Sequence, residues 1–109
     1  MAYDRQLAMQ VRAALSKEET MTEREMFGGI GFMVAGNMAC GVTGDDLIVR
    51  VGPDNYESAL NEAGVSEFDM TGRPMRGWVV VESAAMPTDS ELRRWVQRGV
   101  TFARTLPAK

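Results

Sequence analysis

The sequence contains no histidine and only one cysteine, Cys40, among its 109 residues. Without histidine, the chain lacks the commonest general base and the commonest metal ligand. A lone cysteine can complete neither a Cys/His zinc site nor an internal disulfide, and it favours a reducing compartment. We therefore expect a cytoplasmic protein that is not an enzyme and that holds no metal and no cofactor.

Long apolar runs are also missing. No stretch approaches the roughly 20 residues that a membrane-spanning helix needs, and the first residues lack the cationic start and apolar run of a signal peptide. The net charge is −3 and the pI is near 4.9, so no overall positive field attracts nucleic acid and we expect no direct DNA binding. The length and the 45% hydrophobic content predict one globular domain over residues 1–109.

Three segments have the three- and four-residue apolar spacing of helices that pack on a sheet. They cover residues 3–17, 53–63 and 88–106. The last of them has the clearest start, because Thr88 and Glu91 stand at the spacing of a capping box.

Between the first two helices, short apolar runs are separated by glycine. The expected strands cover residues 21–27, 30–35, 38–42 and 47–51. Tight turns join these strands, which predicts an antiparallel meander, and Gly36-Asn37 is the expected two-residue turn between the second and third strands. Met38, Cys40 and Val42 are expected on one inward face, with Cys40 as a buried, inert thiol.

A further strand is expected at residues 78–82, and residues 65–70 can add a short one. Residues 71–77 are expected to form the loop between them. The predicted fold is therefore α+β with two layers, in which an antiparallel meander sheet packs with three helices. Its expected order is one helix, four strands, one helix, one or two strands and a final helix.

Three glycines within four positions, Gly28, Gly29 and Gly31, follow Phe27 and mark a forced bend. Backbone amides at such a bend can bind an anion, but no Lys-Ser or Lys-Thr pair follows, so a structural bend is the better interpretation. Arg24 precedes the bend and can either brace it or face a ligand. Arg24, Phe27, Gly28 and Gly29 are therefore candidate binding residues.

The expected 71–77 loop supplies two further candidates, Arg73 and Arg76, which stand between glycines. Loops carry binding residues more often than packed elements do. The nine methionines leave two interpretations open, because clustered methionine either forms an adaptable binding groove or fills an irregular core.

The run from Arg24 to Gly31, Arg-Glu-Met-Phe-Gly-Gly-Ile-Gly, resembles the opening of the TfoX/Sxy N-terminal domain family, which reads Arg-x-Met-Phe-Gly-Gly-x-Gly. The resemblance extends over roughly residues 3–106. Further similar positions are Gly36, Met38, Leu47, Arg50, Gly72, Pro74 and Met75. It implies a two-layer α+β fold and, in full-length bacterial relatives, regulation of DNA-uptake competence as coactivators of a cyclic-AMP-receptor-type transcription factor. Those relatives carry a second, helical domain, so we expect this sequence to supply at most half of such a regulator.

Two functions remain open at this point. The first is a non-catalytic regulatory domain that binds a protein partner, which by resemblance belongs to the transcription machinery. The second is a small-molecule or anion-binding module whose cleft is lined by Arg24, Arg73 and Arg76. Open edge strands in a short meander also make a homodimer an expectation.

Overall fold

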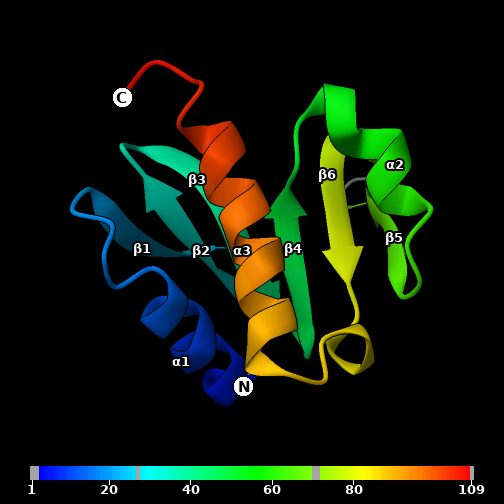
Figure 1. Cartoon of the computed structure of the whole chain (residues 1–109), viewed down its shortest axis with the longest axis horizontal. Coiled ribbons are helices and arrows are strands. Elements are labelled where there is room, and N and C mark those ends of the chain that lie inside the picture. The colour runs from blue at the N-terminus through cyan, green and yellow to red at the C-terminus, as the bar shows by residue number, and fades with distance from the viewer. Residues whose placement is uncertain (1–2, 27, 70–71, 109) are drawn as a thin grey trace.

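The computed structural model of the chain describes residues 3–26, 28–69 and 72–108. It contains three helices and six strands in the described residues (Figure 1). The helices are α1 (Arg5–Ala14), α2 (Tyr56–Leu60) and α3 (Asp89–Ala103). The strands are β1 (Met21–Met26), β2 (Gly29–Val34), β3 (Asn37–Thr43), β4 (Asp46–Arg50), β5 (Val65–Asp69) and β6 (Pro74–Val81).

The six strands form one antiparallel sheet in the order β1-β2-β3-β4-β6-β5. The predicted four-strand meander is therefore confirmed, and β6 returns to pair with β4 while β5 takes the outer edge. Helices α1 and α3 lie against the same face of the sheet (Figure 1). The predicted α+β fold, an antiparallel sheet packed with three helices, is confirmed.

The hydrophobic core lies between the sheet and these helices. Alternate residues of the central strands point into it, and Phe32, Leu47, Val49 and Val79 have no exposed surface. A Cβ built on Gly99 of α3 would lie 2.2 Å from the carbonyl oxygen of Ala39. Glycine at this position therefore lets α3 approach the backbone of β3 directly.

Helices α1 and α3 begin at side-chain caps, and all three helices are shorter than the apolar spacing predicts. The Asp4 carboxylate accepts hydrogen bonds from two amides in the first turn of α1. The Thr88 hydroxyl accepts one from the Glu91 amide, which confirms the first bond of the predicted capping box. The Glu91 carboxylate reaches back as predicted, but it accepts a hydrogen bond from the Thr88 hydroxyl. The helix predicted at residues 53–63 is instead a 3-10 turn followed by the five residues of α2. It ends early because the chain must reverse at Gly64, where φ is +77°, to start β5.

The turn between β2 and β3 differs from the expected Gly36-Asn37 pair by one residue. Val34 pairs with Asn37, so the two turn residues are Ala35 and Gly36, whose φ angles are +52° and +83°. Both angles being positive is the pattern of a type I′ turn. Asn37 is instead the buried first residue of β3, and its side-chain amide donates a hydrogen bond to the carbonyl of Pro107 at 2.9 Å.

The prediction that Met38, Cys40 and Val42 share the inward face of the third strand is wrong for Met38. Phe32 pairs with Cys40 but Met33 pairs with Met38, so Ala39 is an extra residue in a β-bulge. The bulge reverses the side-chain alternation, and it turns Met38 away from the face that Cys40 and Val42 share.

The boundary of the last strand is also corrected. Pro74, Met75 and Arg76 belong to β6 and not to the expected loop. Gly77 interrupts the strand with a φ of +95°, and its carbonyl accepts hydrogen bonds from the amides of both Val51 and Gly52, at 2.9 and 3.0 Å.

The Ala35 turn yields a stability prediction. A non-glycine residue in the left-handed region costs roughly 1–2 kcal/mol, whereas asparagine tolerates that region and leads the favoured Asn-Gly type I′ pair. We expect Ala35→Asn to raise the free energy of unfolding by about 0.5–1 kcal/mol in urea titrations. Ala35→Val is the matched control and should lower it, since β-branched residues fit this region worst. A loss of stability in Ala35→Asn would contradict the turn assignment.

Candidate functional site

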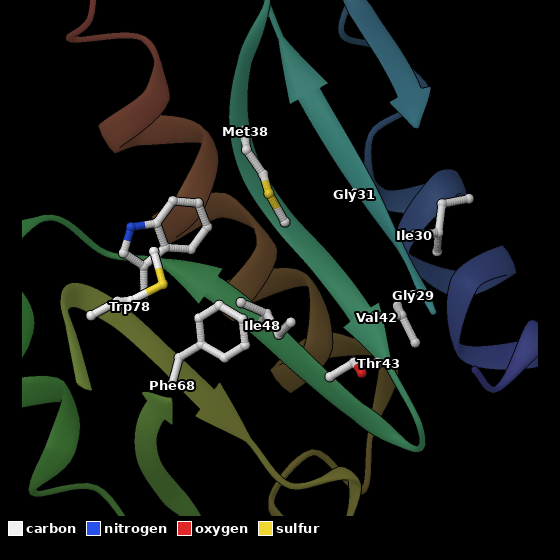
Figure 2. Close-up of a pocket in the computed structure, with 10 residues that line it drawn as sticks. Gly29, Ile30, Gly31, Met38, Val42, Thr43, Ile48, Phe68 and Trp78 are labelled. Atoms are coloured by element: carbon white, nitrogen blue, oxygen red, sulfur yellow. The ribbon is translucent and has the colours of Figure 1, made fainter. Parts of the chain in front are cut away.

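The face of the sheet opposite α1 and α3 carries an apolar hollow. Its volume is about 210 Å³, and the side chains of Met38, Ile48, Phe68 and Trp78 point toward it from four different strands (Figure 2). Its lining residues are Gly29, Ile30, Gly31, Met38, Val42, Thr43, Ile48, Phe68, Met75 and Trp78. Thr43 and Trp78 are the lining residues whose side chains carry a polar group.

The side chains that form the walls of the hollow bury one another, although neither α1 nor α3 packs on this face of the sheet. Ile48 is only 6% exposed, although α1 and α3 lie on the other face of the sheet. The rings of Phe68 and Trp78 stand 6.2 Å apart at 42°, a separation in the range of favourable aromatic pairs. The Met38 methyl lies 2.8 Å from where a Gly41 side chain would begin, so glycine at this position lets Met38 lie flat on the sheet.

The size of the hollow determines what it can hold. Pockets for drug-sized molecules usually measure about 300–1,000 Å³, whereas an apolar cavity of about 150 Å³ accommodates benzene. A hollow of about 210 Å³ therefore suits one bulky apolar side chain or a small aromatic fragment. Met38 and Met75 can adjust its shape, because methionine is unbranched and flexible.

Arg24 lies beside this hollow, on the edge strand β1. Its neighbour Glu23 pairs with Arg12 of α1 on the helical face, so the alternation of the strand places Arg24 on the opposite, open face. Arg24 stands directly across from Gly31, a lining residue. It is exposed, and within the described residues its guanidinium has no carboxylate partner.

Arg50 lies at the end of β4, across from Trp78. Its guanidinium carbon is 5.0 Å from the Trp78 ring centroid and 5.3 Å from that of Phe102 on α3. Two aromatic rings thus hold the cation in place through cation–π attraction. In the part of the chain that the structure describes, Arg50 also forms no ion pair.

The remaining predicted site residues do not gather at one place. Arg76 lies against Tyr56 of α2, with its guanidinium 5.6 Å from that ring, and Arg73 is exposed in the connection before β6. β1 and β6 are four strand spacings apart, about 19 Å. Arg24 and Arg76 therefore do not share a cleft.

The glycine bend serves mainly the backbone. Gly28 is exposed with a φ of +76°, and a Cβ on Gly29 would lie 2.4 Å from the carbonyl oxygen of Val42. Gly29 and Gly31 also line the hollow. Phe27 lies outside the described residues.

The single thiol is unsuited to nucleophilic chemistry as it stands. Cys40 is fully buried on the helical face, and burial raises the pKa of its thiol to about 12. Among the described residues, no group of three acidic or cysteine side chains could hold a metal ion, and no described helix is long and apolar enough to cross a membrane.

Within the described residues, the antiparallel sheet carries helices on one face and the apolar hollow on the other, so the molecule is a small two-layer α+β domain. The family model of the TfoX N-terminal domain matches residues 13–103 of the 109. The chain therefore belongs to the TfoX N-terminal domain family. Comparison with curated proteins and with solved structures gave no match.

Sequence reasoning missed most of the residues that form the hollow. One signal was available, because Leu47-Ile48-Val49 is apolar on both faces of β4 and such runs indicate burial on both sides of a sheet. The contribution of Met38 had no local signal, since it depends on the bulge at Ala39.

Proposed function

We propose that this domain is a non-catalytic protein-interaction module that binds its partner on the open face of the sheet. The observation that carries the proposal is the apolar hollow around Ile48, which is walled by Phe68, Trp78 and two methionines. In protein interfaces, a few residues contribute most of the binding energy, and they often form a pocket that receives one anchor side chain of the partner. The absence of histidine and the buried state of Cys40 support a role without catalysis.

Membership of the family extends the proposal to a regulatory role. By the resemblance of the chain to competence regulators, the partner is a component of the cytoplasmic transcription machinery. Direct DNA binding is disfavoured, because two arginines on α3 and the one directly after it are held in ion pairs. These pairs are Arg93–Asp89, Arg98–Glu62 and Arg104–Glu18.

The charges on the β1 edge disfavour a homodimer formed through it. Extending the sheet across a two-fold axis pairs residues that share a face. Of the two central registers, one sets Glu23 against its own copy and the other sets Arg24 against its own copy. Like charges directly opposite each other are destabilising, so the open face is the better candidate for an interface.

The proposal predicts a specific loss of binding. We expect Met75→Glu, which places a carboxylate in the wall of the hollow, to reduce partner recovery at least about tenfold. Recovery is measured by affinity capture of the tagged domain from its own cells, with quantitative mass spectrometry. Met9→Glu is the matched control, since Met9 lies on α1 with 63% exposure and the substitution changes the net charge equally.

The two variants separate the possible outcomes. Partners that Met75→Glu loses and Met9→Glu retains are those bound at the open face. Equal recovery of every captured protein by the two variants would refute the proposal. Circular dichroism spectra that match the wild type establish that both variants are folded.

A further inference from the structure

The arginines of this domain divide into those that form an ion pair and those that have no carboxylate partner among the described residues. Four of them form ion pairs, and these lie on α1, on α3 or directly after α3. They are Arg12, Arg93, Arg98 and Arg104. Arg24 and Arg50, on strands beside the hollow, have no carboxylate partner among the residues that the structure describes. The same is true of Arg5, Arg73, Arg76 and Arg94, of which Arg76 lies against Tyr56 of α2. An acidic chain of net charge −3 thus keeps Arg24 on its open face without a carboxylate partner in the described residues, and Arg50 likewise at the end of β4, between Trp78 and Phe102 of α3.

Arg50 is also held in one orientation. Its guanidinium lies within 5.0 and 5.3 Å of two aromatic ring centroids, those of Trp78 and Phe102. A cation fixed in this way loses little conformational entropy when it binds an anion, and the planar guanidinium presents several donors to a carboxylate. Because Trp78 is also a wall of the hollow, a ligand there lies next to this cation.

The spacing of the two cations limits the shape of the ligand. β1 and β4 are three strand spacings apart, about 14 Å. The register sets Arg24 in line with Ile48, two residues along β4 from Arg50, so the Cα atoms of the two arginines are about 16 Å apart and their side chains must reach inward to a shorter ligand. β2 and β3, which carry Gly31 and Met38 of the hollow, lie between them. An extended peptide covers about 13 Å between residues four apart, and its residues i, i+2 and i+4 point to the same side.

We propose that the hollow binds an extended acidic segment of a partner protein, with an aromatic side chain in the hollow and a carboxylate two residues to each side that reaches Arg24 and Arg50. The inference rests on the proposed interaction function and specifies the chemistry of the partner. Asp46 lies at the opposite end of β4 from Arg50, beside Thr43, so it disfavours a segment that is shifted toward that end.

The test uses synthetic peptides in a Gly-Ser background with a fluorescein label. The first peptide has glutamates two positions before and after a tryptophan. In the second, lysines replace the glutamates, and in the third, alanine replaces the tryptophan. We expect fluorescence anisotropy to show saturable binding of the first peptide below about 1 mM, with both altered peptides at least about tenfold weaker.

Protein variants assign the contacts. Arg24→Gln and Arg50→Gln should each weaken the first peptide about three- to tenfold, and higher salt should weaken it further because exposed charge pairs are screened. Arg5→Gln is the matched control, since Arg5 is exposed at the start of α1, and it should leave the affinity unchanged.

The inference is overturned if the acidic peptide does not bind, if the lysine peptide binds equally well, or if neither open-face variant affects binding. These results would leave the proposed function intact as long as Met75→Glu loses partners that Met9→Glu retains. Loss of the acidic preference alone would mean that the open face binds a partner of different charge.

Discussion

Replacing Gly99 with valine is expected to lower the free energy of unfolding by about 3 kcal/mol or more. A Cβ at this position would lie 2.2 Å from the Ala39 carbonyl oxygen and 3.0 Å from its carbonyl carbon. Both atoms belong to the backbone of β3, so a rotamer change cannot relieve the overlap and α3 must move away from the sheet. Such a movement would loosen the packing of Trp95, Val96 and Val100 in the core.

Gly99→Ala gives a graded version of the same test. Alanine favours a helix over glycine by about 1 kcal/mol, so a loss of stability in this variant isolates the cost of the close approach. Gln97→Ala is the control, because Gln97 is exposed on the same helix and should change stability by no more than about 0.5 kcal/mol. Urea unfolding followed by tryptophan fluorescence measures all three. Stabilisation by Gly99→Ala would refute the direct contact between α3 and β3.

The features of the fold that can be predicted are those that depend on residues close together in the sequence. The capping box at Thr88 and the glycine-separated apolar runs of the meander need only local chemistry, and the structure contains both. The one-residue error at Ala35-Gly36 has the same local origin, because alanine gives no sign that it adopts a positive φ.

The features that could not be predicted depend on contacts between distant segments. The bulge at Ala39 coincides with the point where Gly99 of α3 approaches β3, and these residues are far apart in the chain. The bulge turns Met38 to the open face, so the shape of the hollow also depends on this contact between distant segments. The same is true of Arg50, whose position requires Phe102 of α3 as well as Trp78 of β6.

This dependence also explains why the predicted arginine site was dispersed. Arg24, Arg73 and Arg76 share the same chemistry, but whether their side chains meet depends on strand order. Because β6 pairs with β4, Arg76 lies near α2 while Arg24 lies at the far edge. The strand order instead puts Arg24 and Arg50 on either side of β2 and β3.

Phe32→Ala is expected to lower the free energy of unfolding by about 4 kcal/mol. Phe32 has no exposed surface and lies on the helical face of β2, so the substitution removes its apolar burial and leaves a closed cavity beneath the helices. Phe68→Ala makes the same chemical change on the open face. There the vacated space joins the hollow and fills with water, so we expect a loss of only about 2 kcal/mol, close to the transfer free energy alone.

Urea unfolding of the two variants tests whether the core lies on one side of the sheet, and equal losses would refute that assignment. The comparison also bears on function. By this expectation Phe68 contributes only about 2 kcal/mol to stability, while it supplies a wall of the hollow. If Phe68→Ala abolishes peptide binding and leaves most of the stability, then the open-face aromatic residues are maintained for binding more than for folding.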